Sequence, residues 1–198
     1  MQTYCIILAA GNSKRFSDNE NKLFSKIYDT PLIFFTLSNI LKVFNKKEVF
    51  IVINKNLSKK HQFFLKKFTE NKLIYGGSSR FKSLKKAIQY FKNDVNLLIH
   101  DAARPNIEKG LIKKIKKEIE NSNSYSVVPY TLITDTLKNK KLNKYSSVKR
   151  SQFINTQTPQ ALKLDKTTKK IISSLQKNVM DESEIFDKSN LKIKYLSG

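Results

Sequence analysis

The sequence predicts an α/β fold: a Rossmann-like three-layer sandwich in which a mostly parallel sheet lies between two layers of helices. Short apolar runs typical of buried parallel strands alternate with segments of helical periodicity. Strands that alternate with helices in this way pair in parallel, because each right-handed crossover returns the chain to the same end of the sheet. The expected strands are residues 4–9, 49–53, 73–75, 97–99 and 125–128.

Helical periodicity is clearest after Thr30-Pro31, where a capping residue is followed by a proline at the first helical position. The apolar residues of this segment share one helix face: Ile33, Leu37, Ile40, Leu41 and Phe44. Three further helices are expected at about residues 58–68, 82–91 and 108–121.

Length and composition favour one domain, residues 1–198, with a sizeable core. Hydrophobic residues make up 39% of the chain, which supports a globular fold, and the single cysteine, Cys5, excludes an internal disulfide. The sequence shows no signal-peptide pattern and no apolar run long enough to span a membrane, so a reducing cytoplasm is the expected location.

A formal net charge of +22 would ordinarily indicate a nucleic-acid partner. Here the lysines are spread through predicted helices such as residues 108–121, and zinc-finger spacings and aromatic RNA-binding motifs are lacking. We therefore expect solvated helix faces with some non-specific affinity for polyanions, and no specific nucleic-acid partner.

The first predicted strand ends in Ala9-Ala10-Gly11, and two cations follow at Arg15 and Lys22. Small residues let a ligand approach the backbone closely, and exposed amide groups at such a turn can bind phosphate oxygens. Fixed positive charge beside the turn would strengthen that binding. The segment therefore predicts a nucleotide-phosphate site.

Only four of the 38 basic residues are arginines. In a chain that uses lysine for generic positive charge, an arginine indicates a need for the planar, bidentate guanidinium group. All four arginines lie at the ends of predicted segments: Arg15, Arg80, Arg104 and Arg150.

Three motifs fall at the carboxyl ends of predicted strands: the Ala9-Ala10-Gly11 turn, the Gly76-Gly77 loop and His100-Asp101. Ligands of open α/β sheets bind beyond these strand ends, so we expect the three motifs to converge on one edge. His100 is expected to support the loop that follows it.

Residues 131–157 interrupt the alternation with a polar stretch rich in lysine and asparagine. Short strand-like pieces are expected at residues 134–137 and 153–155. An excursion of this length in a compact domain is usually functional, and we expect a protruding arm.

Taken in order, these motifs resemble those of the 2-C-methyl-D-erythritol 4-phosphate cytidylyltransferases, a family within the sugar- and polyol-phosphate nucleotidyltransferases. The resemblance covers essentially the whole chain. It is carried by Ala9-Ala10-Gly11 with Arg15 and Lys22, Gly76-Gly77-Ser78-Ser79-Arg80 with Ser83, His100-Asp101-Ala102-Ala103-Arg104-Pro105, Asp135-Thr136-Leu137-Lys138, Arg150, Gln157-Thr158-Pro159-Gln160 and Asp181-Glu182.

The resemblance implies an enzyme that joins CTP to a polyol phosphate and releases pyrophosphate. It implies catalytic roles for Arg15 and Lys22, with Mg²⁺ bound mainly through the CTP phosphates. The residues implied to bind CTP are Ala9, Ala10, Gly11, Gly77 and Ser83. Those implied to bind the polyol phosphate are Asp101, Arg104, Thr136, Arg150 and Thr158.

The resemblance also implies a homodimer in which the arm reaches the partner's site. This chain departs from the family in having Ser13 where a second glycine is usual, and in a C-terminus shorter than usual. Two other functions remain open at this stage. One is a ribitol-5-phosphate cytidylyltransferase, which shares the first and third motifs, and the other is a non-catalytic basic nucleic-acid-binding protein on the same fold.

Overall fold

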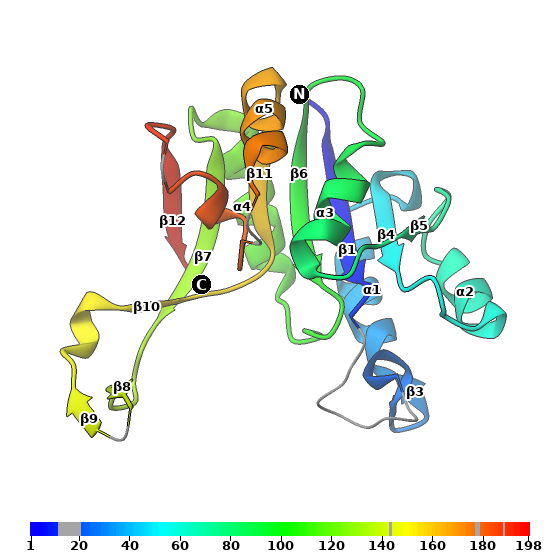
Figure 1. The fold of residues 1–198 in the computed structure, drawn as a ribbon. Coiled ribbons are helices and arrows are strands. Elements are labelled where there is room, and N and C mark those ends of the chain that lie inside the picture. The colour runs from blue at the N-terminus through cyan, green and yellow to red at the C-terminus, as the bar shows by residue number, and fades with distance from the viewer. Residues whose placement is uncertain (12–20, 143, 177–178, 188) are drawn as a thin grey trace.

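The computed structural model describes residues 1–11, 21–142, 144–176, 179–187 and 189–198. Within these ranges the main sheet has eight strands in the order β10-β7-β11-β6-β1-β4-β5, with β12 also paired to β7 (Figure 1). Its strands are β1 (Thr3–Ala9), β4 (Val49–Ile53), β5 (Ile74–Tyr75), β6 (Val95–Asp101), β7 (Ser126–Leu132), β10 (Ile154–Thr156), β11 (Gln160–Leu164) and β12 (Ile193–Ser197).

Five α-helices and four short 3₁₀ helices connect the described strands. The α-helices are α1 (Leu32–Leu41), α2 (Lys59–Lys66), α3 (Arg80–Ile88), α4 (Lys109–Asn121) and α5 (Lys166–Ser174). The 3₁₀ helices are η1 (Lys22–Phe24), η2 (Lys46–Glu48), η3 (Arg150–Gln152) and η4 (Ser183–Ile185). Two small antiparallel ladders pair β2 (Lys26–Ile27) with β3 (Thr30–Pro31) and β8 (Lys138–Lys141) with β9 (Lys144–Ser147).

The sheet confirms the predicted α/β class and all five predicted strands. β1 lies at its centre and pairs in parallel with both β4 and β6, and β4 pairs in parallel with β5. β11 was not predicted; it runs antiparallel between β6 and β7. The parallel half therefore carries the strand ends at which the sequence places its three motifs.

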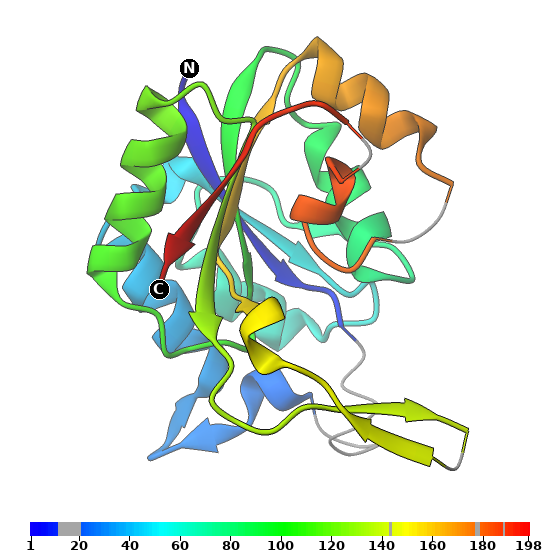
Figure 2. The same ribbon diagram turned by 90° about the vertical axis from the view of Figure 1, so that its left-hand side faces the viewer.

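Helices cover both faces of the sheet, which explains why its strands read as continuous apolar runs. Successive β1 residues point to opposite layers: Ile7 packs in the core under α1, α2 and α4, and Ile6 packs in the core under α3 and α5. Both side chains are fully buried. Figure 2, viewed along the sheet edge, shows α1 and α4 on one side and α3 and α5 on the other.

Local capping sets the helix starts. Ser58 and Ser79 each accept a backbone N–H with their hydroxyl groups and so begin α2 and α3. The expected start of α1 at Pro31 is wrong by one residue, because Thr30 and Pro31 pair with β2 as a strand and the helix begins at Leu32. α5, which was not predicted, is capped by the Asp165 carboxylate.

The arm leaves the sheet after β7 and returns in β10, which pairs antiparallel with the end of β7. Between them, residues 133–153 project from the body of the protein (Figures 1 and 2). The expected strand at residues 134–137 is wrong. The arm's ladder begins only at Lys138, paired with Ser147, because the chain opposite turns into η3 at Arg150 and cannot extend it.

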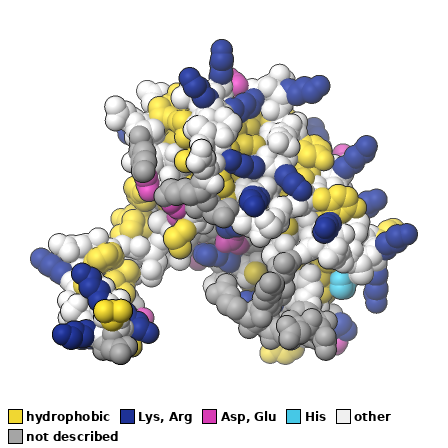
Figure 3. Space-filling model, in the orientation of Figure 1, with side chains coloured by type: hydrophobic (Ala, Val, Ile, Leu, Met, Phe, Trp, Pro, Cys, Tyr) yellow, Lys and Arg dark blue, Asp and Glu magenta, His cyan; other side chains and the backbone are white. Residues whose placement is uncertain are grey.

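No helix in the described part of the chain is both long and apolar enough to cross a membrane. Lysine and arginine side chains are scattered over the face shown in Figure 3 and over the arm, rather than gathered in one stripe. This distribution agrees with the expectation of solvated helix faces.

Candidate active site

The three motifs meet at one edge of the sheet, as predicted. The Gly76 N–H donates to the Ile53 carbonyl at the end of β4, and the Ala102 N–H donates to the Leu8 carbonyl in β1. The chain segments that follow β1, β5 and β6 are therefore neighbours. The first turn, the glycine loop and the Asp101 segment form one continuous rim.

Gly76 and Ala10 bring the first turn and the glycine loop into direct contact. A Cβ at position 76 would lie 2.5 Å from the Ala10 Cβ, closer than side-chain carbons approach. The loop accordingly needs glycine because of space, not because of its backbone dihedral angles, since the structure shows no glycine with positive φ. Gly11 faces open space and is exposed.

Ser83 holds the glycine loop from inside. Its hydroxyl donates to the Ser79 carbonyl (2.8 Å) and accepts the Gly77 N–H (3.1 Å), and the residue is only 2% exposed. Lys86 adds a bond from its Nζ to the Gly76 carbonyl (3.0 Å). These contacts fix the backbone of Gly77, which is itself half-buried at the rim.

Asp101 lies between two arginines. Its Oδ1 accepts from Arg80 Nε at 3.0 Å, and its Oδ2 lies 3.2 Å from Arg104 Nε. The Asp101 side chain is 26% exposed and that of Arg104 is 52% exposed, so both remain accessible from the rim. The structure thus brings together the predicted pair Asp101 and Arg104.

Arg80 also pairs with a second carboxylate, which is buried and which the sequence prediction did not assign to the site. Its Nη1 and Nη2 donate to Glu182 Oε1 (2.6 Å) and Oε2 (3.0 Å), and the Glu182 side chain is fully buried. Burial raises the pKa of Glu182, an effect that the Arg80 guanidinium opposes. The rarity of arginine in the chain was a signal for the importance of Arg80, but not for its pairing with Glu182.

The Asp181 carboxylate ties the root of the arm to β11. It accepts from Thr156 Oγ1 (2.9 Å) and from Gln160 Nε2 (3.1 Å), and also from the Ser183 hydroxyl. Burial raises the pKa of Asp181, but these hydrogen bonds together hold it below its ordinary value. The side-chain oxygen of Gln160, Oε1, in turn accepts the Glu182 N–H.

His100 supports the Asp101 segment, as expected. Its Nε2 lies 2.9 Å from the Arg104 carbonyl, which only accepts, so Nε2 carries the proton. Burial lowers the pKa of His100 to about 4. The imidazole is therefore neutral near pH 7, with a buried Nδ1 that has no hydrogen-bond partner within the described structure.

Lys22 is exposed at the start of η1, and Arg15 lies outside the described residues. The segment that carries Lys22 is anchored from below by Leu23, which is buried, and by the Asn21 side chain, which accepts the Leu23 N–H at 3.1 Å. Phe24 adds a parallel stack on the His61 ring, with centroids 3.7 Å apart. Lys22 is thus an exposed cation on a fixed support.

The arm carries the remaining predicted residues. Thr136 and Arg150 are exposed, and the Arg150 guanidinium donates to the Thr134 carbonyl within the arm. Because residues 133–153 project from the body, the chain's own fold does not bring these two residues to Asp101. Thr158 lies at the arm's root before a cis peptide bond to Pro159, and its buried hydroxyl lacks a partner among the described groups.

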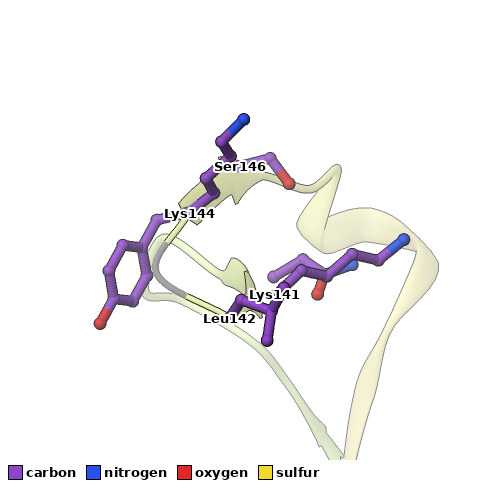
Figure 4. Close-up of a pocket in the computed structure, with 6 residues that line it drawn as sticks. Lys141, Leu142, Lys144 and Ser146 are labelled. Atoms are coloured by element: carbon purple, nitrogen blue, oxygen red, sulfur yellow. The ribbon is translucent and has the colours of Figure 1, made fainter.

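The tip of the arm forms an open pocket that is separate from this rim (Figure 4). It is lined entirely by residues of the β8–β9 hairpin: Asn139, Lys141, Leu142, Lys144, Tyr145 and Ser146. A single hairpin cannot enclose a ligand. We therefore assign the chemistry to the rim at the strand ends and not to this pocket.

The described residues of the rim offer a metal ion few protein ligands. Among the described residues no group of three or more His, Cys, Asp or Glu side chains could hold a metal ion. Asp101, moreover, has both carboxylate oxygens paired with arginines. Mg²⁺ commonly binds through substrate phosphates and water with one or two carboxylates, so it does not need a protein cage.

Comparison with known proteins gives one consistent result. The family model described as 2-C-methyl-D-erythritol 4-phosphate cytidylyltransferase (IspD) matches residues 3–198. A bifunctional enzyme IspD/IspF of Pelagibacter ubique is 34% identical over 203 residues, which cover 100% of this chain and 53% of that protein. A 2-C-methyl-D-erythritol 4-phosphate cytidylyltransferase of Bacillus cytotoxicus is 34% identical over 161 residues, covering 78% of this chain and 70% of that protein.

Among solved structures, the bifunctional IspDF of Campylobacter jejuni matches with a TM-score of 0.79 and 26% identity. The match covers 100% of this chain and 50% of that one. The chain thus spans about half the length of both bifunctional relatives.

Proposed function

The chain belongs to the 2-C-methyl-D-erythritol 4-phosphate cytidylyltransferase family, and from that premise we propose that it joins CTP to 2-C-methyl-D-erythritol 4-phosphate. The products are 4-diphosphocytidyl-2-C-methyl-D-erythritol and pyrophosphate, in isoprenoid biosynthesis. We take residues 1–198 as one nucleotidyltransferase domain. The observation that carries the proposal is the contact of the Ala10 turn with the Gly76-Gly77 loop. This contact supports the proposal because it brings the turn and the loop within reach of a single nucleotide, which would bind its phosphates at the turn and its base at the loop.

In this proposal the Ala9-Ala10-Gly11 turn holds the triphosphate through its backbone, and Gly77 recognises cytosine through its backbone carbonyl, because its N–H is already bonded to Ser83. Ser83 contributes by holding the Gly77 N–H and so fixing the loop. Asp101 and Arg104 bind the polyol phosphate at the adjoining strand end. In this proposal the base, the triphosphate and the polyol phosphate bind one after another along the rim, as they are arranged in the reacting complex.

The reaction brings two anions together, since a phosphate oxygen of the polyol attacks the α-phosphorus of CTP. Positioning and charge neutralisation therefore supply most of the rate, as in phosphoryl transfer generally. We assign the charge that develops at the α-phosphate to Arg15 and Lys22. Mg²⁺, bound mainly through CTP phosphate oxygens, would neutralise further phosphate charge.

We also propose a homodimer in which Thr136, Arg150 and Thr158 bind the polyol phosphate, partly from the neighbouring subunit, whose arm would carry Thr136 and Arg150 to the site. The arm exposes apolar side chains that its own domain does not cover: Leu132, Leu142, Tyr145, Phe153 and Ile154. Several exposed apolar side chains on one projecting segment favour an interaction surface. The dimer would also explain how Thr136 and Arg150 reach a polyol phosphate from which their own fold separates them.

The test is a pyrophosphate-release assay with four nucleoside triphosphates against a panel of polyol phosphates. We expect release only with CTP and 2-C-methyl-D-erythritol 4-phosphate. Turnover with ribitol 5-phosphate instead would identify the other cytidylyltransferase. Salt-dependent DNA binding without pyrophosphate release from any pair would support the nucleic-acid-binding alternative, which the family match does not favour.

CTP binding can be tested separately by thermal unfolding, because a ligand that binds only the folded state raises its stability. CTP with Mg²⁺ should raise the melting temperature more than ATP, GTP or UTP does. Equal shifts with all four nucleotides would refute the role of the Gly76-Gly77 loop in base recognition.

A further inference from the structure

A partly buried ion-pair network connects the glycine loop to the Asp101 segment. At its centre is Arg80, the first residue of α3, whose guanidinium faces two carboxylates in different directions. Nε donates a hydrogen bond to Asp101, and both Nη groups donate hydrogen bonds to Glu182. The two carboxylates raise the pKa of Arg80 although burial lowers it, so the guanidinium stays charged.

Glu182 cannot contact a substrate, because its side chain is fully enclosed. Its backbone is also fixed, since its N–H donates to the Gln160 side chain at 3.0 Å. Gln160 itself pairs with Ile99 in β6, two residues before Asp101. Glu182 is therefore held in place by the β6–β11 strand pair, and β6 also carries Asp101.

The division of the guanidinium between two acids has a geometric consequence. In the structure both Nη groups of Arg80 donate to Glu182 and the bond to Asp101 comes from Nε, so Arg80 holds one oxygen of the Asp101 carboxylate. The other oxygen stays with Arg104. Without Glu182, Arg80 would be free to grip Asp101 with two N–H groups and to draw its carboxylate away from Arg104.

We propose that Arg80 and Glu182 are positioning residues that set the orientation of the Asp101 carboxylate toward the polyol phosphate. This rests on the proposed function, in which Asp101 binds that substrate. A lysine at position 80 could neutralise Glu182, but a single ammonium lacks the planar fork that serves two carboxylates at once. The need for that fork accounts for an arginine here in a chain with 34 lysines.

The test compares Glu182→Gln and Arg80→Lys with Glu118→Gln. The control removes the Glu118–Lys194 ion pair (2.7 Å), which joins α4 to β12 and contacts none of the residues assigned to the rim. Arg80→Lys keeps a cation beside the buried Glu182, so it remains informative if Glu182→Gln does not fold. Michaelis constants for both substrates are measured, together with the dissociation constant of the polyol phosphate by calorimetry.

Both test variants should raise the Michaelis constant and the dissociation constant for the polyol phosphate about tenfold, as expected for a misaligned charge-assisted contact. The Michaelis constant for CTP should stay within about twofold, and Glu118→Gln should change neither value. In an Asp101→Asn background, Glu182→Gln should produce no further loss of polyol phosphate binding, because both changes act through one carboxylate.

Two outcomes would overturn the proposal. A folded variant that binds the polyol phosphate as the parent does removes the positioning role. Equal losses for CTP and the polyol phosphate would show that the pair only stabilises the fold. The parent protein is assayed first, before any variant is compared. If it transfers no cytidylyl group to any polyol phosphate, the proposed function itself is refuted.

Discussion

Gly76 and Ala10 approach so closely that position 76 has no room for a larger residue: a Cβ on Gly76 would lie 2.5 Å from the Ala10 Cβ. It would also lie 2.7 Å from Ser83 Oγ, the atom that accepts the Gly77 N–H. One contact therefore joins the first turn, the glycine loop and the helix behind it. A small change at this point tests the integrity of the whole nucleotide rim.

Gly76→Ala should destabilise the protein by about 1–3 kcal/mol, the usual cost of forcing an extra methyl group into a packed site. It should also abolish the stabilisation of the fold by CTP, because the two loops can no longer keep their spacing. Chemical denaturation with and without CTP measures both effects.

Gly110→Ala is the matched control for that substitution. Gly110 lies in the first turn of α4, and a Cβ there would meet nothing within 4 Å. Alanine should stabilise the helix by about 0.5–1 kcal/mol through the lower entropy of the unfolded chain. A Gly76→Ala variant as stable as Gly110→Ala would show that the loops separate without cost.

Lys22→Ala should lower the rate of cytidylyl transfer by roughly a hundredfold or more, the typical loss when one preorganised electrostatic group is removed. Stability should change little, because Lys22 is exposed and η1 is anchored through Leu23. Single-turnover kinetics at saturating CTP isolates the chemical step. Lys26→Ala, which removes an exposed lysine four residues away, serves as the control and should retain full activity.

The parallel half of the sheet could be predicted because burial on both faces imprints continuous apolar runs on the sequence, as Ile6 and Ile7 illustrate. β11 and β12 leave no such imprint, since lysines interrupt both strands and their pairing depends on distant partners. α5 did carry a readable signal in its capping residue, Asp165, whose carboxylate accepts the Thr168 N–H at 2.8 Å.

The site, like the fold, has one part that the sequence predicts and another that it does not. Convergence of the glycine turn, the glycine loop and Asp101 follows from strand order alone, because parallel strands end at one edge. The Arg80–Glu182 pair spans 102 residues, and no local pattern predicts which acid a given arginine will meet. Likewise, the position of Arg150 relative to any site depends on the projection of the arm, which sequence periodicity does not encode.

His100 should make stability depend on pH between about 4 and 6.5. Its pKa is lowered to about 4 in the fold, whereas an unfolded histidine titrates near 6.5. The unfolded state therefore binds more protons in this window, and stability present above pH 6.5 is lost as the pH falls. The loss should approach roughly 3 kcal/mol by pH 4.

His100→Gln should remove most of that dependence, since glutamine can donate to the Arg104 carbonyl but does not titrate. Free energies of unfolding from urea titrations at pH 4.5 and 7 measure the difference. His61→Gln is the control. The pKa of His61 is also lowered, by burial and then by Lys60, but the ring is partly exposed and should contribute less. Equal slopes in the parent and His100→Gln would contradict the assignment.

Arg150→Ala should raise the Michaelis constant for the polyol phosphate and leave that for CTP nearly unchanged, because in the proposed dimer Arg150 serves only one substrate. The adjacent exposed residue offers a matched control, Lys149→Ala, which should change neither constant.

Mixing Arg150→Ala with Lys22→Ala tests whether Arg150 acts across the dimer. Each mixed dimer would contain one site with both native side chains, so random subunit exchange should restore about a quarter of the parent activity. Exchange is verified independently by mass spectrometry of the mixed dimers. Verified exchange with no activity above that of either variant would show that the arm does not complete the partner's site.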